Sequence, residues 1–206
     1  MKVKICGITD PEDAKHAARC GADYIGIIFA RSSKRCVSLS QGRQIARIAR
    51  KEGAEPVGIF ADETADEIFS ICRTCEIKTI QLHGEISQKA FLTLRPHFFI
   101  IYAVFVESDG TILPGQNIPP GPILLFDSPK GGSGKSFAFE DLSLPKDCEC
   151  FLAGGLNPNN ISRAIELLNP DGVDVASGVE YASNIRKDPE LIENFIQAAK
   201  KIEEEV

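Results

Sequence analysis

The chain has 206 residues, a formal net charge of −6 and a hydrophobic content of 43%, the composition of an ordinary globular domain. The negative net charge disfavours an electrostatic grip on nucleic acid or on an anionic membrane. No apolar run approaches the roughly 20 residues that a bilayer-spanning helix needs, and the first residues lack the apolar core of a signal peptide. We therefore expect a cytoplasmic protein that binds neither nucleic acid nor membrane.

The seven cysteines are an odd number in a chain expected in a reducing compartment, so we expect free thiols. Cys72 and Cys75 have the spacing of a metal or redox pair, but they fall inside a helical pattern and no second such pair exists. Cys148 and Cys150 are separated by one residue, which is unusual for structural zinc. The sequence therefore predicts no bound metal.

Short apolar runs alternate with helical patterns along the chain, and this alternation predicts a parallel sheet. In chain order, we expect strands at 2–6, 23–28, 56–60, 77–82, 98–104, 122–127, 149–153 and 172–176. We expect helices at 11–20, 40–52, 65–75, 87–95, 157–168 and 189–203, with less regular crossovers near 107–117 and 137–143. Asp10-Pro11, Asn157-Pro158 and Asp188-Pro189 each place a capping side chain before a proline at the first helical position. Thr64 and Glu67 have the spacing of a capping box.

Two architectures fit this alternation. A doubly wound open sheet usually has a G-x-G-x-x-G turn after the first strand, and Cys6-Gly7-Ile8-Thr9 lacks that pattern. Eight strands with glycine-rich turns after the seventh and eighth favour an α/β fold of the (β/α)8 TIM-barrel class. No linker or low-complexity stretch interrupts the chain, so we expect residues 1–206 to form one compact catalytic domain.

Residues capable of proton transfer stand where the predicted strands end. Cys6 ends the first strand and Asp127 ends the sixth, and the carboxyl ends of parallel strands meet at one mouth of a barrel. Aspartate is disfavoured in strands and rarely buried unpaired, which favours a functional Asp127. Cys6 is a nucleophile, an acid–base group or a buried packing residue. Asp174 faces either the lumen or the helices, and His83 either lines the site or caps a turn.

Glycine-rich turns add a candidate phosphate site. Gly154-Gly155 and Ser177-Gly178 follow the seventh and eighth strands, where backbone N–H groups of barrels commonly hold a phosphate. The run Gly131-Gly132-Ser133-Gly134 invites a P-loop interpretation, but Pro129 stands where that motif needs its first glycine. We therefore interpret this run as a cover over the substrate, following Asp127.

Taken together, these motifs resemble the phosphoribosylanthranilate isomerase family of tryptophan biosynthesis. Each motif is weak alone, but the set falls in order and spans nearly the whole chain. The matching stretches are Lys4-Ile5-Cys6-Gly7-Ile8-Thr9, Gln81-Leu82-His83-Gly84, Phe126-Asp127-Ser128, Gly131-Gly132-Ser133-Gly134-Lys135, Ala153-Gly154-Gly155-Leu156 and Gly172-Val173-Asp174-Val175-Ala176-Ser177-Gly178-Val179-Glu180.

The resemblance implies an Amadori rearrangement of N-(5-phosphoribosyl)anthranilate to 1-(2-carboxyphenylamino)-1-deoxyribulose 5-phosphate. The family's general acid, here Asp127, protonates the ribose ring oxygen, and the ring opens to a Schiff base. The family's general base, here Cys6, then removes the C2′ proton. This chemistry needs no metal and no cofactor. The partner is a small phosphoribosyl substrate, and the chain is expected to be a monomer or a homodimer.

The resemblance also implies substrate contacts. The family has an arginine at Arg35 that binds the carboxylate of the anthranilate ring, and a guanidinium suits that planar group. The alternative is a solvent-exposed basic turn, since Arg31 and Lys34 flank this position. His83 and Asp174 are the other expected substrate-binding residues.

Two alternative functions remain open from the sequence. The histidine-pathway sugar isomerase runs the same rearrangement on a similar barrel, but it uses an aspartate where Cys6 stands and needs a second phosphate site. Phe60-Ala61-Asp62, after the third predicted strand, offers no glycine pair for such a site. A catalytically silent phosphate-binding barrel is the other alternative, and the presence of both Cys6 and Asp127 argues against it.

Overall fold

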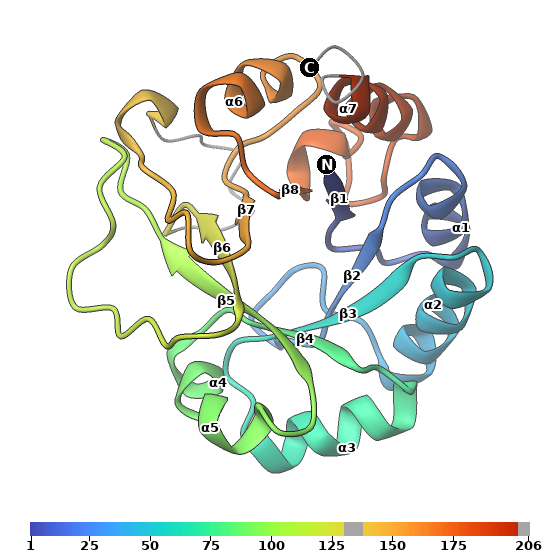
Figure 1. Cartoon of the computed structure of the whole chain (residues 1–206). Helices are drawn as coiled ribbons and strands as arrows, with labels where there is room; N and C mark the ends of the chain where they lie inside the picture. Colours follow the sequence, from blue (N-terminus) through green and yellow to red (C-terminus); the bar gives the residue numbers. More distant parts are fainter. Residues whose placement is uncertain (130–137, 202–206) are drawn as a thin grey trace.

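A closed barrel of eight parallel strands forms the centre of the molecule (Figure 1). The computed structural model describes residues 1–129 and 138–201. Each strand pairs with its neighbour in sequence, and the eighth pairs with the first, which closes the barrel. The predicted TIM barrel is therefore confirmed and the open sheet is excluded. The strands are β1 (Lys2–Ile5), β2 (Tyr24–Ile28), β3 (Glu55–Phe60), β4 (Thr79–Leu82), β5 (Phe99–Phe105), β6 (Ile123–Asp127), β7 (Cys150–Leu152) and β8 (Gly172–Val175).

Helices surround this barrel except beside β5 and β6, where irregular chain covers the outside (Figure 1). Within residues 1–129 and 138–201, none of the helices is long and apolar enough to cross a membrane. The α-helices are α1 (Pro11–Arg19), α2 (Leu39–Lys51), α3 (Ala65–Cys75), α4 (Glu85–Lys89), α5 (Phe91–Leu94), α6 (Ile161–Leu168) and α7 (Pro189–Lys201). Two short 3-10 helices are η1 (Phe139–Asp141) and η2 (Ser177–Val179).

Side-chain caps fix several helix starts as the sequence predicts. Asp10 Oδ1 accepts a hydrogen bond from the backbone N–H of Glu12 at 2.8 Å, and Asp188 Oδ1 accepts one from Glu190 at 2.9 Å. The capping box of α3 is complete, because the Thr64 and Glu67 side chains each accept from the other residue's backbone N–H. These caps satisfy backbone donors that would otherwise lack a partner at the first turn.

Two predicted helices are wrong in detail. The helix expected at 157–168 begins at Ile161, because Asn157 and Asn160 form a turn in place of a cap. Asn160 Oδ1 accepts from the N–H of Asn157 at 2.8 Å, and Asn160 Nδ2 donates to the carbonyl of Gly155 at 3.0 Å. The helix expected at 87–95 is divided into α4 and α5. The buried hydroxyl of Ser87 donates to the carbonyl of Phe60 at 3.0 Å, which ties α4 to β3 before the chain turns into α5.

The barrel lumen is apolar at its centre and polar towards one mouth. Val57, Ile101, Leu125 and Phe151 fill the central layer and are all fully buried. Side chains alternate along a strand, so a residue two positions further on faces the same side. Asp127 therefore stands above Leu125, at the mouth where the carboxyl ends of the strands meet. The apolar layer fills the lumen beneath this mouth, so the pocket at the mouth is open only at the carboxyl ends of the strands.

Candidate active site

A cavity of about 570 Å³ opens at the carboxyl ends of the strands. Cys6, Arg35, His83, Asp127 and Asp174 all line it, so the five predicted catalytic and substrate-binding side chains lie around one pocket. They come from β6, β8 and the turns that follow β1, β2 and β4. Because Asp174 lines this cavity, its side chain faces the barrel lumen and not the helices.

Asp127, the last residue of β6, is a carboxyl group able to hold a proton near neutral pH. Its side chain is buried, and burial together with the nearby charge of Asp174 raises its pKa to about 7. The backbone N–H of Ser128 donates to Asp127 Oδ1 at 2.7 Å, and Lys4 also opposes the rise. The other oxygen, Oδ2, lies 3.6 Å from His83 Nε2. A carboxyl group with this pKa can act as a general acid at neutral pH.

His83 follows β4 and lines the cavity. Of the two predicted positions, lining the site or capping a turn, the structure shows the first. Gln81 Nε2 lies 2.9 Å from His83 Nδ1, and the ring meets Phe105 edge-on with centroids 5.4 Å apart. Burial and the charge of Lys4 lower the pKa of His83 to about 4. The imidazole is therefore neutral at pH 7 and offers a hydrogen bond without a charge.

Cys6 stands directly after β1 and is 6% exposed. Burial raises the pKa of its thiol, and the ammonium groups of Lys4 and Lys187 oppose that rise. Lys4 and Cys6 are two residues apart, so they share the lumen side of the chain. The thiol is thus kept protonated in the free site, with two cations nearby that favour its thiolate.

A buried ion pair lies beneath the thiol. Lys4 Nζ donates to Asp174 Oδ1 at 3.0 Å, with the two side chains 0% and 7% exposed. Burial lowers the pKa of Lys4, but the charges of Asp174 and Cys6 outweigh burial and the net shift is upward. The ammonium is therefore charged at neutral pH, and it balances the cluster of acidic groups at this mouth.

Arg35 is buried, so the alternative of a solvent-exposed basic turn is wrong. Its guanidinium pairs side-on with Glu180, with Nε 2.5 Å from Oε1 and Nη2 3.0 Å from Oε2. Burying a guanidinium needs such a partner. Lys187 Nζ also donates to Glu180 Oε1 at 3.0 Å. Arg35 reaches the cavity from the loop after β2.

The glycine turns after β7 and β8 meet at a small recess beside the cavity. Gly154, Gly155 and Ser177 line this recess, and so does Asp127. Gly154 and Gly155 adopt φ values of 84° and 71°, which a side chain would strain. Gly178 lies behind the recess in η2, where a side chain would collide with the carbonyl oxygen of Leu156. The predicted cover, Gly131 to Gly134, falls outside the described residues.

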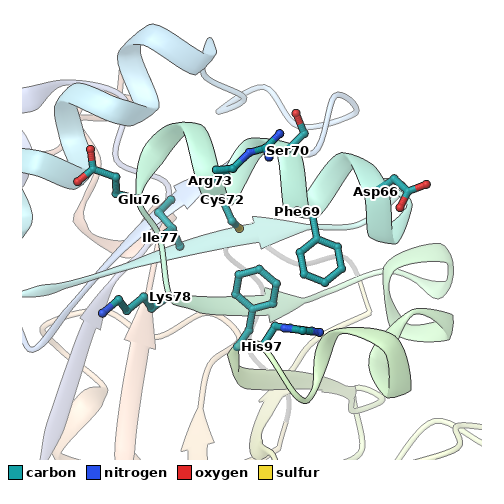
Figure 2. Close-up of a pocket in the computed structure, with 10 residues that line it drawn as sticks. Asp66, Phe69, Ser70, Cys72, Arg73, Glu76, Ile77, Lys78 and His97 are labelled. Atoms are coloured by element: carbon teal, nitrogen blue, oxygen red, sulfur yellow. The ribbon is translucent and has the colours of Figure 1, made fainter.

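A larger hollow, of about 850 Å³, lies outside the barrel between α3 and the chain leading into β5 (Figure 2). Phe69 and His97 meet edge-on on its wall, with ring centroids 5.1 Å apart, and Asp66 and Glu76 stand at the two ends of α3. Cys72 lines it as well, and burial raises the pKa of that thiol to about 12. The thiol therefore stays protonated at neutral pH.

The cysteines are free, including Cys72 and Cys75. Among residues 1–129 and 138–201, no group of three or more His, Cys, Asp and Glu side chains could hold a metal ion. Cys148 and Cys150 lie with their sulfur atoms 3.8 Å apart, at the end of the barrel where β7 begins.

A family model described as N-(5'phosphoribosyl)anthranilate (PRA) isomerase matches residues 3–198. The chain belongs to this family. N-(5'-phosphoribosyl)anthranilate isomerase of Chlamydia caviae is 52% identical over 206 residues, which is 100% of each chain. The crystal structure of phosphoribosyl anthranilate isomerase from Thermus thermophilus superposes with a TM-score of 0.83 and 30% identity, covering 98% of this chain and 100% of that one.

A further solved phosphoribosyl anthranilate isomerase holds reduced 1-(o-carboxyphenylamino)-1-deoxyribulose 5-phosphate. It matches this chain with a TM-score of 0.77 and 29% identity, covering 98% of this chain and 99% of that one. The resemblance drawn from the ordered motifs is therefore confirmed.

Several buried polar residues of this phosphoribosylanthranilate isomerase barrel escape sequence reasoning. Lys4 and Lys187 are fully buried, and Gln81 is 2% exposed with no partner for its Oε1 among the described residues. Polar residues inside predicted strands were the available signal for Lys4 and Gln81, because a strand buried on both faces is normally apolar. Lys187 and Glu180 lie after β8, where an antiparallel bridge places them side by side. The pairing of Glu180 with Arg35, in contrast, joins residues 145 positions apart and needs the closed barrel.

Proposed function

We propose that this isomerase converts N-(5-phosphoribosyl)anthranilate to 1-(2-carboxyphenylamino)-1-deoxyribulose 5-phosphate in tryptophan biosynthesis, with Asp127 as general acid and Cys6 as general base. The observation that carries the proposal is the placement of both groups around one closed-ended cavity. The ligand of the relative described above has the product's skeleton, with a carboxyphenyl group at one end and a phosphate at the other.

In the proposed first step, Asp127 gives its proton to the ribose ring oxygen as the C1′–O bond breaks. The electron pair on the anthranilate nitrogen forms the C=N bond of a Schiff base. The Cys6 thiolate then removes the C2′ proton, and the electrons of that C–H bond move to make an enolamine. Tautomerisation of the enol gives the ketone. The steps only redistribute protons and electron pairs among the substrate, Asp127 and Cys6, so no redox partner is required.

The two pKa shifts predict the protonation state that reacts. Asp127 titrates at about 7, and the pKa of Cys6 lies above its ordinary value of 9.0, so in the free enzyme the carboxyl group ionises first. The reactive form has the proton on Asp127 and a thiolate on Cys6. It has the same number of protons as the main form near neutral pH, in which Asp127 is ionised and Cys6 is a thiol. Because Asp127 has the lower pKa of the two, only a small fraction of the singly protonated molecules is in this form. Lys4 and Lys187 increase that fraction by favouring the thiolate.

The two ends of the substrate fit the two ends of the site. We assign the anthranilate carboxylate to Arg35, whose guanidinium reaches the cavity. We assign the phosphate to Gly154, Gly155, Ser177 and Gly178, because glycine turns after the last two strands suit an anion. His83 is neutral and lies beside Asp127, so it suits a hydroxyl or the ring oxygen and not an anion.

The fluorescence of phosphoribosylanthranilate tests the activity directly. A catalytic amount of the protein is expected to abolish the fluorescence of a large excess of substrate. A silent phosphate-binding barrel would bind at most one equivalent of substrate and would leave the fluorescence of the rest unchanged. The histidine-pathway substrate, offered under the same conditions, is expected to be left unchanged. Turnover of that substrate at a comparable rate would contradict the assignment to tryptophan biosynthesis alone.

We propose a cytoplasmic location and a monomeric or homodimeric state. The seven cysteines are free, as expected in a reducing compartment. Sedimentation equilibrium measures the oligomeric state, and a tetramer or larger assembly would contradict this proposal.

A further inference from the structure

One carboxylate at the rim of the cavity is shared by two buried cations. Glu180 accepts from Arg35 through both of its oxygens and from Lys187 through Oε1. The side chains of Arg35, Glu180 and Lys187 are 6%, 7% and 0% exposed. We propose that Glu180 is a positioning residue, which fixes Arg35 so that the free edge of its guanidinium is presented to the substrate carboxylate. This inference rests on the carboxylate-binding role proposed for Arg35.

The geometry of the pair leaves one edge of the guanidinium free. A guanidinium carries five N–H groups in a planar fork. Glu180 occupies the side edge of Arg35, taking the N–H of Nε and one N–H of Nη2. Both N–H groups of Nη1 and the second of Nη2 remain, and one from each of these nitrogens forms the end edge; no described residue accepts from Nη1. A second carboxylate can therefore bind end-on while Glu180 stays in place.

The stem of Arg35 lies close to Gly7. A side chain on Gly7 would place its Cβ 2.5 Å from Arg35 Cδ, so the stem lies directly across the turn that follows Cys6. The absence of a side chain at Gly7 leaves room for this stem beside the proposed base. With its guanidinium held by Glu180, Arg35 loses less conformational freedom when a ligand binds.

Lys187 extends the arrangement to the other end of the site. Its Nζ donates to the carbonyl of Ala176 at 2.8 Å as well as to Glu180. Ala176 immediately precedes Ser177, in the turn assigned to the phosphate. Glu180 therefore links the loop after β2, which carries Arg35, to the turn after β8. Burial raises the pKa of Glu180, but Arg35 and Lys187 outweigh burial and the net shift is downward, so the carboxylate is charged at neutral pH.

Two ligands separate a positioning role from a general structural one. The first is reduced 1-(2-carboxyphenylamino)-1-deoxyribulose 5-phosphate, and the second is the same compound with phenyl in place of carboxyphenyl. We expect Glu180→Gln to weaken binding of the first by about 10- to 100-fold, since Arg35 loses its partner and a charge-assisted bond is lost or misdirected. Binding of the second is expected to change by less than about threefold, because it has no carboxylate for Arg35 to hold.

The matched control is Glu63→Gln. Glu63 is another buried carboxylate at this mouth, 3% exposed, and it accepts from the N–H of Ala61 in the loop after β3 at 3.0 Å. Among the described residues, no hydrogen bond or ion pair joins Glu63 to Arg35. We expect this variant to bind both ligands as the parent does.

A double-mutant cycle decides whether Glu180 acts through Arg35. In the Arg35→Ala background, Glu180→Gln is expected to cause no further selective loss. Equal weakening of both ligands by Glu180→Gln, or an undiminished selective loss without Arg35, would overturn the inference. If Arg35→Ala itself weakens both ligands equally, the proposed role of Arg35 fails, which is a distinct outcome. Should Glu180→Gln not fold, Glu180→Asp keeps the charge, and the same selective loss, smaller in size, is expected.

Discussion

Replacing Lys4 by Met removes the ammonium of the buried pair while keeping a side chain of similar length. Lys4 Nζ is 3.0 Å from Asp174 Oδ1, and the two side chains are 0% and 7% exposed, so the substitution leaves a largely buried carboxylate without its partner. Breaking a buried pair by removing one member costs about 3–5 kcal/mol. Since Met fills most of the space, we expect little added loss from a cavity. The free energy of unfolding at pH 7, measured by urea titration, should therefore fall by about 3–5 kcal/mol.

The double variant Lys4→Met/Asp174→Asn checks the cause of that loss. Removing both charges leaves no buried ion unpaired, so we expect it to recover more than half of the stability. A loss below about 1 kcal/mol for Lys4→Met would refute the reasoning, since that is the scale of an exposed pair. The single variant should also shift the activity profile. Lys4 holds the pKa of Asp127 down, so its removal should move the acidic limb of kcat/KM to higher pH.

Three further predictions follow from the site. The profile of kcat/KM against pH should be bell-shaped, rising through about 7 as Asp127 ionises and falling at alkaline pH as Cys6 ionises, because the reactive form carries one proton and burial raises the pKa of Cys6; a profile falling through 7 would contradict this. Gly178→Ala should raise Kd for phosphate-bearing ligands at least tenfold in calorimetry, because its Cβ would collide with Leu156 and separate the two turns; unchanged affinity would remove Gly178 from the phosphate site. Cys72→Ser should keep parental kcat in the fluorescence assay, since this thiol lies outside the barrel; a tenfold loss would contradict that placement.

Much of the fold can be predicted from local sequence patterns, because most of these patterns form the expected strand or helix in the barrel. Alternating apolar runs and helices predict a parallel sheet, and parallel strands bring their carboxyl ends together whatever the details of packing. Cys6 and Asp127 are 121 positions apart by number, yet their place at strand ends was enough to predict that they share a mouth. Strand-end position is a strong signal because it depends only on strand direction.

The electrostatic support of the site needs tertiary structure. Lys4 and Asp174 are 170 residues apart, and Arg35 and Glu180 are 145 residues apart, so neither pair has a sequence spacing that predicts it. Both pairs form because β8 returns beside β1 when the barrel closes. The sequence predicts the start of α6 wrongly for a local reason, since an asparagine side chain can form a turn as well as cap a helix.

The turnover of N-(5-phosphoribosyl)anthranilate by Cys6→Ala and Asp127→Asn tests the central claim most directly. The fluorescence assay should show kcat reduced by about 10²- to 10⁴-fold in each variant, as expected for loss of a general acid or base. Binding of the reduced product analogue, measured in parallel, should stay within about threefold of the parent, because each change preserves the fold and removes only a proton-transfer group. Near-parental turnover by either variant would contradict the account and remove that residue from the mechanism.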